Sequence, residues 1–89
     1  MYYLFHCPDF DTPAYQLAHF TDNRLYLANW YSSLTEAIND ACTSSTSIPT
    51  PEARIQRFQT SHDNLRTIHL IAQAPTTADF YNLYPELFI

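Results

Sequence analysis

Glycine, lysine and valine are all absent from this 89-residue chain, and the first two absences exclude whole kinds of site. Glycine allows a backbone to adopt positive φ or to approach a ligand closely. Phosphate-cradling loops, dinucleotide fingerprints and nucleophile elbows therefore cannot be built here in their usual form. Without lysine there is no Schiff-base nucleophile and no ammonium group to hold a phosphate. The composition thus disfavours several large classes of enzyme.

Positive charge is also scarce, because nine acidic residues outnumber four arginines and give a formal net charge of −5. Direct binding of DNA or RNA needs a basic surface, so we expect none. An acidic excess instead attracts basic surfaces on partner proteins. No apolar run approaches a membrane span, and the first residues lack the basic region of a secretory signal. We expect a cytoplasmic protein with no membrane partner.

Apolar side chains are plentiful, with 46% hydrophobic and 16% aromatic residues. A disordered segment carries far fewer. At this length we expect residues 1–89 to form a single compact domain. Its fold class is predicted to be α+β, with a small antiparallel sheet of about three strands covered by two short helices.

The predicted helices have clear local signals. Ser33 and Glu36 are spaced as a capping box, in which each side chain satisfies a free amide of the first turn. An apolar stripe at helical spacing follows, made of Leu34, Ala37, Ile38, Ala41 and Cys42. The pattern predicts a helix over Leu34–Thr43. A second helix is predicted over Ala78–Tyr84, where Pro85 ends it.

The predicted sheet contains three segments: Tyr2–Cys7, Ala53–Thr60 and Leu65–Gln73. The last two flank Ser61–Asn64, an arrangement that predicts a β-hairpin. Ala53–Thr60 could instead be a helix opened by Thr50, Pro51 and Glu52. The segment Ala14–Tyr31 has alternative predictions. Its first part, up to Phe20, is either a short helix or a strand. A turn follows at Asp22, and the remaining residues form either a second strand or an aromatic loop.

Metal binding and catalysis are both disfavoured. The best metal set combines His6, Cys7 and Cys42 with one of His19, His62 or His69. Zinc ligands usually come as spaced pairs, whereas His6 and Cys7 are adjacent and would point to opposite faces of a strand. A nucleophilic Cys7 or Cys42 beside His69 would need an exposed, electropositive thiol. The two cysteines are expected to be reduced, with a disulfide as the alternative. We expect no cofactor, no metal and no catalytic residue.

The seven tyrosines and the single tryptophan are the feature most suggestive of function, since these residues are enriched at protein interfaces. Acidic residues lie near several of them in sequence. Aromatic anchors within an acidic rim suit a basic partner. The predicted partner-binding residues are Asp9, Asp11, Tyr15, Asp22, Tyr26, Trp30, Tyr31, Asp79, Tyr81 and Glu86.

In size, acidity and lack of catalytic motifs, the whole chain resembles small phage-encoded inhibitors of bacterial defence, in particular anti-CRISPR proteins. The resemblance rests on no shared motif and assigns no residue. It implies a non-enzymatic inhibitor in the host bacterial cytoplasm that occludes the nucleic-acid-binding surface of a CRISPR effector or nuclease. The alternatives are an immunity or antitoxin-type protein that neutralises a basic nuclease toxin, and a small metal-binding or enzymatic domain.

Overall fold

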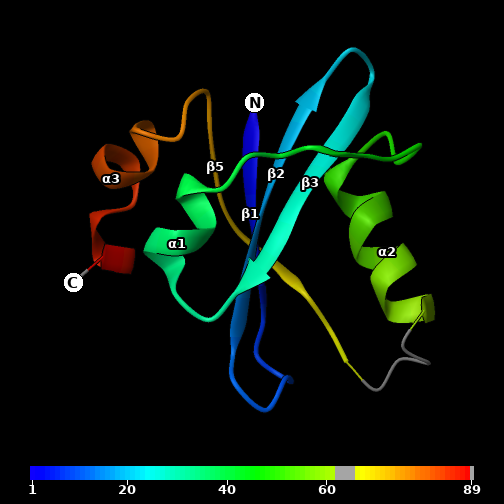
Figure 1. Ribbon diagram of the computed structural model, residues 1–89, viewed down its shortest axis with the longest axis horizontal. Coiled ribbons are helices and arrows are strands. Elements are labelled where there is room, and N and C mark those ends of the chain that lie inside the picture. Colours follow the sequence, from blue (N-terminus) through cyan, green and yellow to red (C-terminus); the bar gives the residue numbers. More distant parts are fainter. Residues whose placement is uncertain (62–65, 89) are drawn as a thin grey trace.

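A computed structural model describes residues 1–61 and 66–88, which form a sheet with helices on both faces (Figure 1). The strands are β1 (Tyr2–Cys7), β2 (Ala14–Thr21), β3 (Arg24–Tyr31), β4 (Ser44–Ser45) and β5 (His69–Ala74). The helices are α1 (Leu34–Asn39), α2 (Pro51–Ser61), α3 (Asp79–Leu83) and the 3-10 helix η1 (Pro85–Phe88). All strand pairs are antiparallel, in the order β4-β3-β2-β1-β5.

The predicted architecture is wrong in its number of elements, since the described residues form five strands and three α-helices. The open segment Ala14–Tyr31 is a hairpin of β2 and β3. β2 is the central strand and is covered on both faces, so Leu17 and Ala18, which point to opposite faces, are both buried. A strand buried on both faces loses the polar alternation that marks a strand in sequence. The strand pattern of this segment is therefore too weak to exclude a helix that starts at Thr12 and Pro13.

The Ala53–Thr60 strand is also wrong, because this segment lies in α2. The Thr50 hydroxyl accepts a hydrogen bond from the Ala53 N–H at 3.1 Å, as a helix cap does. The predicted hairpin is therefore not formed, and β5 pairs with β1 instead. Its turn at Ser61–Asn64 falls largely outside the described residues.

The other predicted helices and the C-terminal strand are present, but they begin or end at residues other than those predicted. The Ser33 hydroxyl accepts a hydrogen bond from the Glu36 N–H at 3.4 Å, which is one of the two bonds of the predicted capping box. The helix ends at Asn39 rather than Thr43, because Asp40 is extended and its carboxylate accepts a hydrogen bond from the Asn29 N–H at 3.1 Å. The predicted Leu65–Gln73 strand begins later, at His69, and Leu65 lies outside the described residues. α3 covers the centre of the predicted Ala78–Tyr84 helix.

The turn between β2 and β3 is built without glycine. Asp22 and Asn23 adopt φ values of 53° and 62°. A two-residue hairpin loop of type I′ needs positive φ at both central positions, and aspartate and asparagine tolerate that region better than most other side chains. A chain lacking glycine can therefore still make this tight turn.

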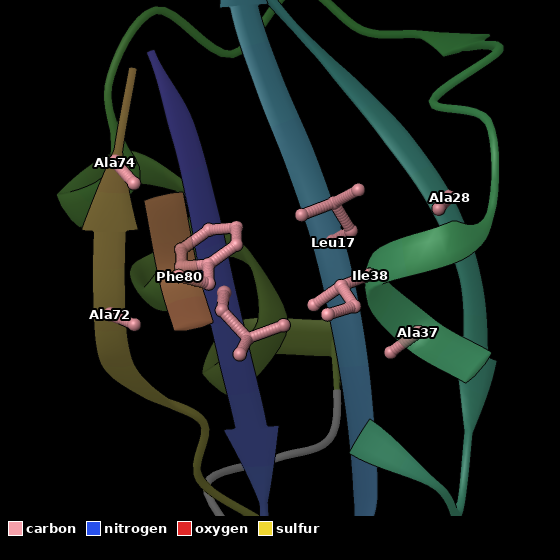
Figure 2. Packing of buried hydrophobic residues seen from close by; sticks show 8 residues of the cluster. Leu17, Ala28, Ala37, Ile38, Ala72, Ala74 and Phe80 are labelled. Carbon is pink, nitrogen blue, oxygen red and sulfur yellow. The ribbon is translucent and has the colours of Figure 1, made fainter. Parts of the chain in front are cut away.

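The core is split by the sheet into two clusters, because neighbouring residues of a strand point to opposite faces. Leu4 belongs to the cluster beneath α1 and α3, while Phe5 belongs to the cluster beneath α2. In the first cluster, Phe80 lies beside the small side chains of Ala72 and Ala74 (Figure 2). Small residues on β5 leave room for this ring and so allow α3 to pack closely on the sheet.

Two stacked pairs flank the central Leu4–Leu17 contact on the face covered by α1 and α3. Tyr2 stacks on His19 with ring centroids 4.1 Å apart, and His6 stacks on Tyr15 at 4.7 Å. Partial burial lowers the pKa of both histidines, and the neighbouring His69 lowers the pKa of His6 further. The folded state therefore favours neutral imidazoles.

We expect the free energy of unfolding to decrease as the pH falls from 7.5 to 5. The unfolded histidines titrate near pH 6.5, whereas His6 and His19 titrate lower when folded. Their contribution is thus complete above about pH 6.5 and is lost as the pH falls through the folded pKa values. Urea unfolding followed by Trp30 fluorescence measures this dependence. A His6→Gln/His19→Gln variant should have a flatter pH profile, and an unchanged slope would contradict the assignment.

Candidate partner-binding surface

The exposed apolar surface concentrates on α3 and η1. Among the described residues, the large hydrophobic side chains that are exposed are Met1, Tyr81 and Leu83, and Leu83 is the most open at 58%. The Tyr81 ring packs on that of half-buried Phe88, with centroids 4.4 Å apart. We call Tyr81, Leu83 and Phe88 the C-terminal patch. Isolated exposed hydrophobic residues are ordinary, whereas contiguous ones mark binding surfaces, and the contact between the Tyr81 and Phe88 rings makes these two contiguous. Leu83 follows two residues after Tyr81 on the same short helix.

The C-terminal patch is positioned by the residues that α3 turns inward. Phe80 is fully buried, and Tyr84, one helical turn later, packs against the same cluster. Thr76 fixes the start of the helix, since its hydroxyl accepts a hydrogen bond from the Asp79 N–H at 3.3 Å and donates one to the Asp79 carboxylate at 2.9 Å. With these groups held in place, Tyr81 and Leu83 are left facing solvent.

The electrostatics of this side of the sheet are acidic. Exposed Glu86 lies on η1, Asp79 on α3, Glu36 on α1, and Asp40 at the end of α1. None of α1, α3 and η1 contains an arginine, lysine or histidine. Two arginines instead lie on α2, on the opposite face. The C-terminal patch therefore belongs to a surface layer whose helices carry only negative side-chain charge.

Of the predicted site residues, the structure brings together Asp79, Tyr81 and Glu86, which lie on α3 and η1. Asp11 is exposed in the turn between β1 and β2, and Asp22 is exposed at the tip of the next hairpin. Asp9 lies in the first of these turns, where its carboxylate accepts hydrogen bonds from the Thr67 N–H at 2.9 Å and the Thr67 hydroxyl at 3.0 Å. These bonds lower the pKa of Asp9.

The predicted aromatic residues of β2 and β3 are half-buried and divided between the two faces. Trp30 packs beneath α2, where its ring meets Phe10 edge-on at 5.5 Å. Tyr15 and Tyr31 pack against the opposite cluster, and a hydrogen bond to Asp40 raises the pKa of Tyr31. Tyr26 lies on β3 opposite His19. These four side chains do not form one surface.

The helical spacing of Phe80, Leu83 and Tyr84 predicts that all three side chains face inward, and for Leu83 this prediction is wrong, since it is 58% exposed. Phe88 was missed because the search followed tyrosine and tryptophan. Phe88 belongs to an apolar tail whose docking depends on the rest of the fold.

The cysteines are free thiols, and neither is set up as a nucleophile. Cys7 is fully buried beneath α2, whereas its neighbour His6 stacks with Tyr15 on the other face. Burial and the negative charge of Asp40 raise the pKa of Cys42 to about 11, so its thiol is protonated at neutral pH. Within residues 1–61 and 66–88, no group of three or more histidine, cysteine or acidic side chains is arranged to hold a metal ion.

In the described part of the chain, no helix has both the length and the apolar character needed to cross a membrane. No protein-family model matches the sequence, and neither a curated protein nor a solved structure matches it. The exposed surface of the protein is therefore the basis for assigning a function.

Proposed function

We propose that the protein is a non-enzymatic inhibitor that uses the C-terminal patch to dock on a basic, nucleic-acid-binding surface of another protein. The observation that carries this proposal is exposed Tyr81, packed on half-buried Phe88, together with exposed Leu83 and the neighbouring Glu86, in a layer whose helices lack basic residues. Such an inhibitor acts as the anti-CRISPR proteins do, in the cytoplasm of the host cell.

Steric occlusion fits this surface better than imitation of a nucleic-acid backbone. A phosphate mimic needs many carboxylates free to face the partner, but several here are committed internally. Asp9, Asp40 and Asp79 all accept hydrogen bonds from neighbouring residues of this chain. Aromatic anchors contribute large contact area with little loss of side-chain freedom, while acidic neighbours steer the approach of a basic partner.

A pull-down from nuclease-treated bacterial lysate tests this function. We expect wild-type protein to capture a basic nucleic-acid-binding protein. A Tyr81→Ala/Leu83→Asp variant should lose at least about 30-fold in affinity, because centrally placed anchors commonly contribute 2 kcal/mol or more. The identity of the captured protein separates a defence effector from a nuclease toxin.

Asn82→Ala is the matched control, since Asn82 is exposed on the same helix and lies between the two substituted residues. It should bind like the wild type. Equal binding by the Tyr81→Ala/Leu83→Asp variant, or capture of free nucleic acid alone, would contradict the proposal. Circular dichroism of each variant confirms that the fold is kept.

A further inference from the structure

The outer edge of β5 borders a second candidate surface. β5 ends the sheet, and its pairing among the described residues is with β1. A cleft of about 390 Å³ follows this edge, lined by Glu52, Leu70, Ile71, Ala72, Gln73 and Tyr84. An uncovered strand edge presents backbone donors and acceptors that can pair with another chain.

The backbone N–H and C=O of Gln73 point into this cleft. Its N–H donates a hydrogen bond to the Tyr84 hydroxyl at 3.3 Å, and its carbonyl accepts one from the same hydroxyl at 3.2 Å. In an antiparallel ladder the N–H and C=O of one residue point to the same side of the strand. Both groups of Gln73 are therefore directed away from β1, and the Tyr84 hydroxyl occupies the place where a further strand would pair.

We propose that this edge binds an extended, basic peptide segment of a partner protein as an added strand, and that the segment displaces the Tyr84 hydroxyl from Gln73. Backbone hydrogen bonds would supply affinity in this mode, and the side chains along the cleft would supply selectivity. This contact surface is separate from the C-terminal patch and does not depend on its function.

The negative charge in the lining of the cleft favours a basic segment as its occupant. Glu52, exposed in the first turn of α2, is the charged side chain among the described residues that line the cleft. It would face an arginine or lysine of the incoming strand. A second copy of this chain is a poorer occupant, because two protomers of net charge −5 would meet edge to edge with a glutamate from each beside the junction.

Fluorescence anisotropy with a labelled synthetic peptide of about nine residues, the length of a long strand, tests the proposal. The probe alternates threonine and valine around a central arginine. One control peptide carries glutamate in place of the arginine, and another carries N-methyl groups on alternate amides. We expect the arginine peptide to bind, the glutamate peptide to bind at least about 10-fold more weakly, and the N-methylated peptide to bind undetectably.

Two variants locate the site on the protein. Glu52→Gln should abolish the preference for arginine over glutamate. Tyr84→Phe should bind the arginine peptide about 3- to 10-fold more tightly, because the competing hydrogen bonds are gone. The Tyr81→Ala/Leu83→Asp variant should bind the peptide as the wild type does, which separates this edge from the C-terminal patch. Binding should also shift the amide resonance of Gln73.

Four results would overturn the inference: equal binding of the N-methylated peptide, no discrimination between arginine and glutamate, no binding of the arginine peptide, or resonance shifts confined to other strands. Sedimentation that shows a Tyr84→Phe dimer unable to bind peptide would assign the edge to self-association instead. Glu52 is exposed, so Glu52→Gln leaves the core intact and its result stands even if Tyr84→Phe is destabilised.

Discussion

Replacing Phe80 with alanine is expected to lower the free energy of unfolding by about 3–5 kcal/mol, the range observed when a buried aromatic ring is deleted from a core. Phe80 is fully buried and packs in the cluster that contains Ala72 and Ala74 (Figure 2). The alanines cannot extend into the space that the ring would leave. A large part of the cavity should therefore remain.

The effect should extend to binding, because α3 has only five residues. A helix of this length is unstable without tertiary contacts, and Phe80 is its buried residue. Urea unfolding gives the change in stability, and the lysate pull-down gives the loss of capture. Asn82→Ala should change stability by less than about 0.5 kcal/mol. A Phe80→Ala protein as stable as this control would show that α3 does not depend on the ring.

Replacing Gln16 with methionine is expected to destabilise the protein by about 3 kcal/mol, because it removes the hydrogen-bond partner of a buried cation. Arg54 is only 8% exposed. Its Nη2 donates to Gln16 Oε1 at 2.8 Å, and Gln16 Nε2 donates to the Ala28 carbonyl at 2.9 Å. Burial lowers the pKa of Arg54, and its Nε atom has no hydrogen-bond partner among the described residues.

A double-mutant cycle isolates this interaction. Gln16→Met/Arg54→Met should recover most of the stability lost in Gln16→Met, because apolar replacement of both members of a buried polar pair is often neutral or stabilising. The recovery would be partial, since the guanidinium also lies over the rings of Trp30 at 5.9 Å and Phe58 at 5.5 Å. Strictly additive losses in urea unfolding would show that Gln16 and Arg54 are not coupled.

Local chemistry made part of the fold predictable. The cap at Ser33 and the turn at Asp22 depend on residues close in sequence, and both are present. The C-terminal members of the candidate site, Asp79, Tyr81 and Glu86, were also close in sequence, so no tertiary knowledge was needed to group them.

Long-range contacts explain what sequence reasoning could not supply. Arg54 and Phe58 are one helical turn apart and buried together, but an arginine at a core position reads as polar and weakens the helical pattern of α2. The partner of β5 is β1, more than sixty residues earlier in the chain, and the sequence carries no local signal for so distant a pairing. The exposure of Trp30 and Tyr31 depends on which face of β3 each occupies, and an irregularity in the β2–β3 pairing shifts that alternation.

The uneven placement of charge gives the molecule an electric dipole across the sheet. Carboxylates are the charged groups of α1, α3 and η1, whereas α2 on the far side carries two arginines, Arg54 and Arg57, and one carboxylate, Glu52. A positively charged body that comes within about 10 Å, the Debye length at 0.1 M ionic strength, would exert a torque on this dipole and rotate the acidic layer toward itself before contact. This alignment would reduce the orientations that a partner must sample by diffusion.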